Sequence, residues 1–250
     1  MNTIGVIPCR YNSKRFPGKP IALICGKPMV VRVWEQASKA KSLTKIVVAT
    51  DDLRIRDICN GYSIDVVLTS SAHITGTDRV AEVADRIRGD VFVNIQGDEP
   101  LIDPIGIDNV VSELQKNDSV VVSNGYSSFG SSNDVSNPNL VKVITDMDGF
   151  AIAFSRCPIP FVKAEEATWK RQLGLYAFRQ SILKQFLRWP RGELERAEEI
   201  EMLRFLEHGH RIKMVEISEE DSIPVDYPDD IEKIESIILK KQHKGRQQYR

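Results

Sequence analysis

A basic loop follows the first strand-like run of the sequence. Residues 7–21 read IPCRYNSKRFPGKPI and include four cations, Arg10, Lys14, Arg15 and Lys19. Arginine can bind phosphate oxygens with two parallel hydrogen bonds, lysine supplies a compact charge, and a glycine permits close approach of the backbone. The segment lacks the first glycine of the P-loop pattern and differs from the G-x-G-x-x-G dinucleotide fingerprint. We therefore expect a polyphosphate site of another kind, with a solvated surface loop as the alternative on this stretch alone.

Two acidic residues far apart in the sequence suit a metal ion that accompanies phosphate. Asp98 lies in QGDEP, directly after the apolar run VFVNI, and Asp226 lies in SIPVDYPDD near the end of the chain. Magnesium is typically bound by one or two carboxylates together with phosphate oxygens. Each motif alone also fits a helix cap or a turn before proline. Together with the basic loop, the pair favours a magnesium and polyphosphate site.

Two further motifs could contact other parts of a ligand. TGTDR, residues 75–79, precedes a helical pattern, so Thr77 or Asp78 could cap that helix or approach a base or sugar. FSR ends with Arg156, which could be a solvated cation or could hold a carboxylate at the mouth of a site.

The elements that must position these motifs alternate between strands and helices in the first half of the chain. Compact, mostly β-branched runs predict buried parallel strands, and apolar faces at helical spacing predict helices between them. The expected strands span residues 3–8, 45–50, 65–69 and 91–96, and the expected helices lie within 28–41 and 78–88. This order predicts an α/β fold with a mainly parallel sheet flanked by helices. Ligands of such sheets bind beyond the carboxyl ends of the strands, where the basic loop and Asp98 follow.

The second half predicts an antiparallel extension of this core. Residues 124–139 are rich in Ser, Asn and Gly and predict a loop, and 140–145 and 150–155 predict a hairpin around the turn at 146–149. A charged helix is expected at 193–208, a strand at 213–217 and a closing helix at 228–241.

Composition restricts the class of protein. The chain has 250 residues and a net charge of −1, which argues against general affinity for nucleic acid or anionic membranes. No apolar run approaches the roughly 20 residues of a membrane span, and the first residues do not resemble a signal peptide. The four cysteines are widely spaced and suggest neither a zinc site nor a disulfide framework. We expect a cytoplasmic protein without membrane insertion or a nucleic-acid partner.

The motifs together resemble those of one enzyme family. IPCRYNSKRFPGKPI, GKPM, VVATDD, TGTDR, NIQGDEP, NPNLVKVI, FSRCPIP and VDYPDDIE occur in the order seen in the 3-deoxy-manno-octulosonate cytidylyltransferases, over about residues 3 to 238. The family pattern P-A-R-x-x-S-x-R-x-P-G-K-P-L is met except for Cys9 and Ile21. The combination is much more specific than any one of its motifs.

The resemblance implies a fold and an activity. The fold would be a single cytidylyltransferase domain over residues 1–250, similar to nucleotide-diphospho-sugar transferases, with an inserted antiparallel dimerisation subdomain at about 120–175 and therefore a homodimer. The activity would be transfer of CMP from CTP to 3-deoxy-D-manno-octulosonate (Kdo), which gives CMP-Kdo and pyrophosphate for lipopolysaccharide or capsule synthesis. The implied cofactor is Mg²⁺.

The resemblance also implies roles for residues that match the family motifs. The triphosphate would be held by Arg10, Ser13, Arg15 and Lys19, and the cytidine pocket would be lined by Thr50, Asp51, Thr75, Gly76 and Thr77. The sugar acid would face Gln96, Arg156 and Tyr176, with Lys142 nearby, and Mg²⁺ would be bound by Asp98 and Asp226. The expected catalytic residues are Arg15, Lys19, Asp98 and Asp226, because they meet the charge of the reacting phosphates.

Two departures from the family pattern fall on the side of the sugar acid. Gln172 stands where the family has histidine in H-L-G-I-Y, and Met202 stands where it has glutamine in E-Q-L-R. Both changes alter which hydrogen bonds an acceptor pocket can offer. Kdo is therefore the leading acceptor, and an amino-Kdo, another 2-keto-3-deoxy sugar acid or a phosphonate acid stays open. A non-catalytic CTP-binding homologue is the alternative from another class.

Overall fold

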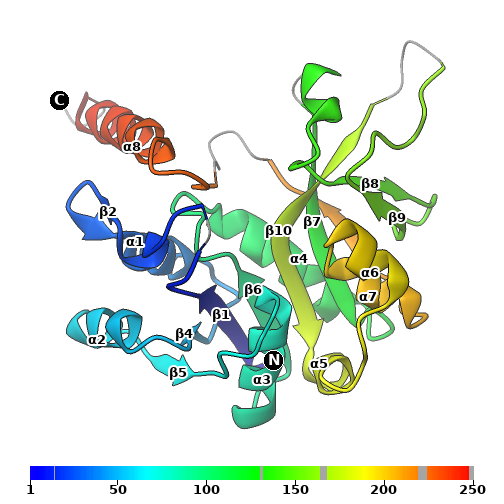
Figure 1. The fold of residues 1–250 in the computed structure, drawn as a ribbon, viewed down its shortest axis with the longest axis horizontal. Helices are drawn as coiled ribbons and strands as arrows, with labels where there is room; N and C mark the ends of the chain where they lie inside the picture. The colour runs from blue at the N-terminus through cyan, green and yellow to red at the C-terminus, as the bar shows by residue number, and fades with distance from the viewer. Residues whose placement is uncertain (14, 130–131, 164–167, 219–223, 248–250) are drawn as a thin grey trace.

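The computed structural model describes residues 1–13, 15–129, 132–163, 168–218 and 224–247. Its central sheet has the strand order β11-β7-β10-β6-β1-β4-β5 (Figure 1). Within the described ranges, no helix is both long enough and apolar enough to cross a membrane.

The parallel part of the sheet consists of the four strands expected from the first half of the sequence. They are β1 (Thr3–Cys9), β4 (Lys45–Thr50), β5 (Val66–Leu68) and β6 (Val91–Ile95). β1 pairs in parallel with β4 on one side and β6 on the other, and β4 continues to β5. Alternate residues of β1 face different cores: Val6 lies in one apolar cluster and Ile7 in the other.

The remaining strands extend the sheet with antiparallel pairs. β10 (Lys170–Arg179) runs antiparallel to β6 and to β7 (Val122–Ser128), and β11 (Lys213–Glu216) pairs in parallel with β7. β8 (Lys142–Thr145) and β9 (Ala151–Ser155) form the expected hairpin, which joins the sheet where β8 pairs with β10. The prediction of a mainly parallel α/β sheet with an antiparallel part is therefore confirmed.

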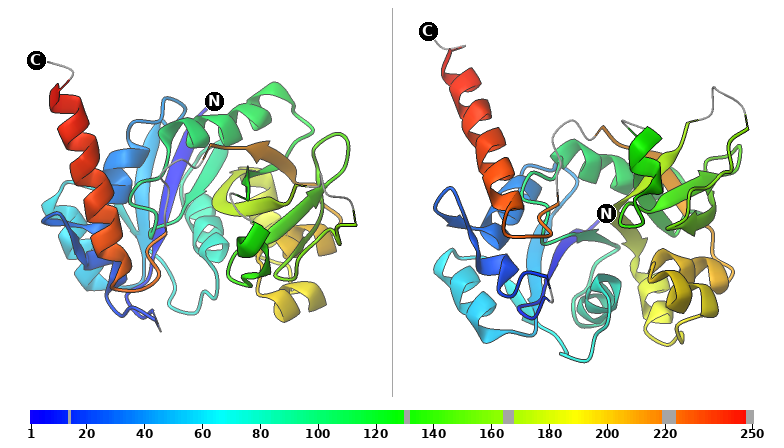
Figure 2. Two further views of the ribbon diagram at one scale, coloured as in Figure 1. Left: turned by 90° about the horizontal axis from the view of Figure 1, so that it is seen from above. Right: turned by 45° about the horizontal axis from the view of Figure 1, so that its top comes forward.

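Helices cover both faces of the sheet, as the two views of Figure 2 show. α1 (Met29–Ala37), α2 (Leu53–Gly61) and α4 (Pro104–Lys116) contribute to one apolar cluster. α3 (Gly76–Arg86), α5 (Gln180–Phe186) and α7 (Met202–Glu207) contribute to the other. The 3₁₀ turns η1 (Lys19–Ile21) and η2 (Ser132–Ser136) lie in the connections.

A third, smaller cluster joins the two ends of the chain. α8 (Asp230–Gln247) places Ile234 and Ile238 against Ile24 of the small hairpin formed by β2 (Leu23–Ile24) and β3 (Lys27–Pro28). Figure 1 shows α8 at the edge of the molecule, with its C-terminal end pointing away from the sheet. The contact keeps the start of α8 close to the basic loop.

Two expectations about secondary structure were wrong. Residues 124–128 were expected in a loop but belong to β7. The polar side chains of this strand form hydrogen bonds inside the protein: the Ser123 hydroxyl donates to Val110 O at 2.7 Å, and the Asn124 amide donates to Gly125 O. The helix expected at 193–208 is two helices, α6 (Glu193–Glu198) and α7. Glu199 separates them in the left-handed conformation, with φ 51°.

Candidate active site

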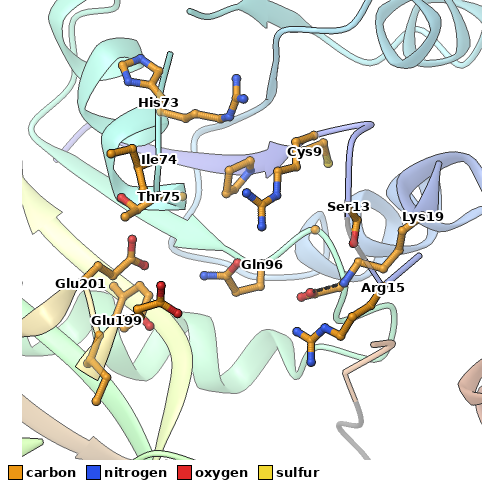
Figure 3. Close-up of a pocket in the computed structure, with 18 of the residues that line it drawn as sticks. Cys9, Ser13, Arg15, Lys19, His73, Ile74, Thr75, Gln96, Glu199 and Glu201 are labelled. Atoms are coloured by element: carbon orange, nitrogen blue, oxygen red, sulfur yellow. Dashed lines mark hydrogen bonds and ion pairs between the residues drawn. The ribbon is translucent and has the colours of Figure 1, made fainter. Parts of the chain in front are cut away.

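A cavity of about 840 Å³ lies beyond the carboxyl ends of β1 and β6. Its wall also includes the start of α3, the turn between α6 and α7, and side chains from β10 (Figure 3). Eleven of the residues expected at the site line it: Arg10, Ser13, Arg15, Lys19, Thr75, Gly76, Gln96, Asp98, Arg156, Gln172 and Tyr176. The structure thus brings together residues that are up to 166 positions apart in the sequence (176 − 10).

The basic loop, residues 10–19 between β1 and η1, forms one end of the cavity. Gly18 adopts a left-handed conformation with φ 74° and turns the chain so that Lys19 begins η1. The ammonium of Lys19 donates to Asp98 Oδ2 at 2.6 Å and to Val225 O at 2.8 Å. Lys14, one of the four cations of the motif, lies outside the described residues.

The two carboxylates predicted to bind metal meet at the same ammonium. Asp226 Oδ1 lies 4.0 Å from Lys19 Nζ and 3.0 Å from Arg15 Nη2, while Asp98 lies on the turn after β6. The backbone joins them as well, because Val225 N donates to Asp98 O at 2.9 Å. Within the described ranges, no three His, Cys, Asp or Glu side chains are grouped closely enough to hold a metal ion. Two carboxylates would need oxygen ligands from a substrate to complete a magnesium site.

The TGTDR motif forms the start of α3, and its alternative role as a helix cap is realised. Thr75 Oγ1 accepts from Asp78 N at 3.1 Å, and Asp78 Oδ2 accepts from Thr75 N at 2.9 Å, which is a complete capping box. Thr75 and Gly76 line the cavity. Thr77 does not line it, because its side chain is fully buried and its hydroxyl accepts from Asn94 Nδ2 at 3.3 Å.

Thr50 and Asp51 also lie behind the cavity wall instead of in it. Thr50 is fully buried at the end of β4, and its hydroxyl accepts from Asp52 N at 3.2 Å. Asp51 forms an ion pair of 3.1 Å with Arg79, which does line the cavity and donates to Thr69 Oγ1 at 2.7 Å. Sequence reasoning missed Arg79, although this residue ends the TGTDR motif. The acids and hydroxyls behind it orient its guanidinium.

At the other end of the cavity, β10 supplies Gln172 and Tyr176. Gln172 donates from Nε2 to Asn124 Oδ1 at 2.9 Å, and Asn124 in turn donates to the carbonyls of Gly125, Leu173 and Leu175. The pairing of β10 with β7 shifts register between Gln172 and Tyr176. Tyr176 is 7% exposed, and burial raises the pKa of its phenol well above the ordinary value.

Gly174 lies within that register shift, and Gln96 at the end of β6 packs directly against it. A Cβ atom at position 174 would lie 2.6 Å from Cγ of Gln96 and 3.2 Å from Oε1 of Glu99. The missing side chain therefore makes room for Gln96 in the wall of the cavity.

Arg156 and Lys142 hold the wall together by hydrogen bonds to the main chain. The Arg156 guanidinium donates to Glu198 O at 2.6 Å, Pro138 O at 2.8 Å and Glu199 O at 3.3 Å. Lys142 is fully buried, and its ammonium donates to Asn137 O and Arg156 O, both at 2.8 Å. Burial lowers the pKa of Lys142. Lys142 was expected near the acceptor; it does not line the cavity, but it donates to the main chain of Arg156, which does.

Met202 also lies elsewhere than expected. Its side chain is fully buried in the apolar cluster around Phe186 and Phe205 and is not among the residues that line the cavity. The correction has a simple cause: α7 begins at Met202, and the first residue of this helix points its apolar side chain into the core.

The preceding residue, Glu201, lines the cavity in its place. Its Oε2 accepts from Thr77 N at 3.0 Å, and burial raises the pKa of this carboxyl. Figure 3 shows Glu201 and Glu199 on one side of Gln96 and Arg15 and Lys19 on the other. Glu201 is the acid of the motif EMLR, and its residue type is the sequence signal for a carboxylate at this position.

The chemistry of the cavity is therefore divided. One end offers cations and the carboxylate of Asp98, with Asp226 paired to the same cations, which suits a polyphosphate with a divalent cation. The other end offers amides, a phenol, carboxylates and the guanidinium of Arg156, which are partners for the hydroxyl and carboxylate groups of a sugar acid. A molecule with phosphates and one with hydroxyls can lie side by side in this space.

Several known proteins are similar to this chain in sequence. The Cytidylyltransferase family model matches residues 4–213. The chain is 44% identical to 3-deoxy-manno-octulosonate cytidylyltransferase of Geobacter sulfurreducens over 246 residues, which covers 94% of this chain and 98% of the relative. It is 40% identical to the protein of the same description from Pseudomonas syringae pv. tomato, over 93% of this chain and 96% of that relative.

Solved structures show the same likeness. The chain superposes on CMP:2-keto-3-deoxy-manno-octonic acid synthetase complexed with CTP with a TM-score of 0.92 and 32% identity, covering 96% of this chain and 100% of the other. A cytidylyltransferase from Leptospira borgpetersenii shares the fold with a TM-score of 0.65 at 17% identity, covering 96% of this chain and 87% of the other.

Proposed function

Because the chain belongs to the 3-deoxy-manno-octulosonate cytidylyltransferase family, we propose that its cavity transfers CMP from CTP to Kdo and releases pyrophosphate. The observation that carries this proposal is the pairing of Lys19 and Arg15 with Asp98 and Asp226 at one end of a cavity whose other end is lined by Gln96, Gln172 and Tyr176. CTP would place its phosphates at the first end and Kdo its hydroxyls at the second.

In the reaction, the anomeric hydroxyl of Kdo would attack the α-phosphorus of CTP. The new bond joins the sugar oxygen to phosphorus, the bond from phosphorus to the bridging oxygen of pyrophosphate breaks, and the hydroxyl proton leaves to solvent. Charge accumulates on the phosphate oxygens, so positioned cations lower the barrier. Arg15 and Lys19 would neutralise the leaving pyrophosphate, and Arg10 and Ser13 would hold the triphosphate in line.

The donor set at the first end fits Mg²⁺, because this ion accepts two carboxylates together with phosphate oxygens. Asp98 and Asp226 are the residues that would hold it. When bound, Mg²⁺ would polarise the phosphates and stabilise the charge of the leaving group. Lys19, which pairs with Asp98 at 2.6 Å in this structure, would then be released to contact phosphate.

At the second end, Gln96, Gln172 and Tyr176 would contact the sugar acid directly. Arg156 and Lys142 would act indirectly, because their donors are bound to main-chain carbonyls. Thr75, Gly76 and Arg79 would approach the nucleoside, and Thr50, Asp51 and Thr77 would support them from behind the wall.

The test is pyrophosphate release by the purified chain with CTP, MgCl₂ and Kdo, with mass detection of the sugar nucleotide. We expect release with CTP and Kdo, and much slower release with UTP or ATP or without an acceptor. Release with an amino-Kdo, another 2-keto-3-deoxy sugar acid or a phosphonate acid, but not with Kdo, would contradict the proposed acceptor alone. CTP binding without release on any acceptor would indicate a non-catalytic homologue.

We also propose that the chain forms a homodimer through the antiparallel segment at about 120–175. The turn and outer face of the β8–β9 hairpin and the segment after it expose Met147, Ile152 and Phe161, with exposed fractions of 102%, 59% and 87%. Such side chains are suited to an interface between copies. Light scattering should give the mass of a dimer, and a monomer would contradict it. A cytoplasmic location and a role in lipopolysaccharide or capsule synthesis stay predictions for cell fractionation and gene deletion.

A further inference from the structure

We propose that Tyr11 and Arg54 form a clasp that holds the basic loop in its nucleotide-binding shape. Neither residue belongs to the wall of the cavity, so both would be positioning residues and not ligands of CTP. This inference rests on the proposed function, because it assumes that the loop binds the triphosphate.

The first half of the clasp is a guanidinium fixed on α2. Arg54 pairs with Asp52 through two hydrogen bonds, from Nε to Oδ1 at 2.9 Å and from Nη2 to Oδ2 at 2.6 Å. Asp52 is the N-cap of α2, and its Oδ1 also accepts from Arg54 N at 2.9 Å. The guanidinium is therefore held relative to the helix although the Arg54 side chain is 57% exposed.

The second half is the ring of Tyr11 in the basic loop. The Arg54 Cζ atom lies 3.2 Å from the centroid of this ring, which is a close cation–π contact. The Asp52 carboxylate already satisfies two donors of Arg54, so the ring contact is additional to the local ion pair.

Tyr11 in turn closes the loop on itself. Its carbonyl accepts from Ser13 N at 3.0 Å and from Gly18 N at 2.9 Å. The hydroxyl end of its ring lies about 3.3 Å from the position that a Cβ of Gly18 would occupy. Tyr11 therefore contacts both ends of the segment that presents Arg15, directly before the start of η1 at Lys19.

An anchor of this kind would hold the loop in shape before CTP binds. Ordering a flexible loop around CTP would cost conformational entropy, and a loop already held in shape avoids this cost. An exposed cation–π contact is expected to change affinity by roughly two- to fivefold. Since the anchor acts before the chemical step, its loss should raise KM and Kd for CTP and leave kcat nearly unchanged.

The test measures CTP binding by calorimetry in MgCl₂ for Tyr11→Leu, Arg54→Met and the double variant. Each single variant should weaken CTP about threefold, and the double variant should be no weaker than the weaker single variant, because both remove the same contact. Tyr11→Phe should restore wild-type affinity, since the ring remains. Hydrogen exchange of the loop without CTP should be faster in the Leu and Met variants.

Arg56→Met is the matched control, because Arg56 lies on the same helix and pairs with Asp57 instead of the loop. It should leave CTP affinity and loop exchange unchanged. Three results would overturn the clasp: an equal loss of CTP affinity in Arg56→Met, additive losses in the double variant, or weakened CTP binding in Tyr11→Phe. In each case, turnover by the wild-type chain would still uphold the proposed function. A wild-type chain that binds no CTP would overturn both.

Discussion

The end of the cavity beside the basic loop and the end beside β10 hold their polar side chains in different ways. At the first, charged side chains pair with each other, as Lys19 does with Asp98, and both are partly exposed, at 15% and 28%. At the second, Gln172 donates to the buried Asn124 and Arg156 donates to main-chain carbonyls. Partly exposed ion pairs contribute little to stability, whereas buried groups are costly to leave without partners. The first end can rearrange around a charged ligand, and the second is a fixed wall.

Removing one charge at the end beside the basic loop should have the largest effect on catalysis. We expect Asp98→Asn to lower kcat for pyrophosphate release at least about 100-fold, because a ligand for the divalent cation is lost. Its thermal unfolding should be nearly unchanged, since the Lys19 pair is partly exposed. Asp118→Asn, in an exposed acid paired with Arg179, is the control. Near-normal turnover of Asp98→Asn would show that this end does not bind the metal.

A polar group placed in the apolar core behind the β10 end of the cavity should lower stability instead of activity. Met202→Gln would bury an amide in an apolar cluster, so we expect a loss of about 2 kcal/mol in the free energy of unfolding, or roughly 5 °C in Tm. KM for Kdo should change less than about twofold. Leu239→Gln places the same amide at an exposed position of α8, outside the proposed dimer segment, and should be neutral. A lower KM for Kdo in Met202→Gln would mean that position 202 reaches the acceptor.

Within the fixed wall, Gln172 offers a direct test of the acceptor. Gln172→Ala should raise KM for Kdo about tenfold and leave KM for CTP unchanged, because one amide is lost and Asn124 Oδ1 loses its donor. Gln185→Ala, on the exposed side of α5, should change neither constant. Equal changes for both substrates would contradict the division of the cavity into two ends.

The smallest expected effect is a pH dependence from Glu201. Burial raises the pKa of this carboxyl above its ordinary value of 4.5, so its contribution to stability is fully present below pH 4.5 and is lost as pH rises through the folded-state pKa. Glu201→Gln does not ionise. Its Tm should therefore rise relative to that of the wild type, by about 2 °C between pH 5 and pH 8.

The exposed Glu232→Gln on α8 should show no such trend in the same melting experiments. A constant difference between Glu201→Gln and the wild type across this pH range would show that the carboxyl titrates alike in the folded and unfolded protein.

Local sequence patterns were sufficient where an element's own residues determine it. The four parallel strands are β-branched runs, and each was placed to within one or two residues of its observed bounds. β7 was missed because its Ser and Asn residues have low strand propensity, and their partners, such as Val110 O and Leu173 O, come from other elements. The interruption at Glu199 was missed because the helical spacing of apolar residues continues through this position, although the backbone there is left-handed and ends the helix.

The site followed the same rule. Motifs predicted which residues gather at the strand ends, but the depth of each side chain depends on packing. Lys142 belongs to a matching motif and Met202 to a motif with one departure, and both are fully buried. Glu201, one residue away from Met202, lines the cavity because a helix starts between them. The residue types of these motifs did not indicate which of their side chains would line the cavity and which would lie behind its wall.

The contact between Gly174 and Gln96 restricts which residue can occupy position 174. A single methyl group at position 174 would meet Gln96 Cγ at 2.6 Å and would have to displace the glutamine side chain from its place in the wall. A glycine-to-alanine substitution would therefore reshape the end of the cavity beside β10 from a position that does not itself line the cavity.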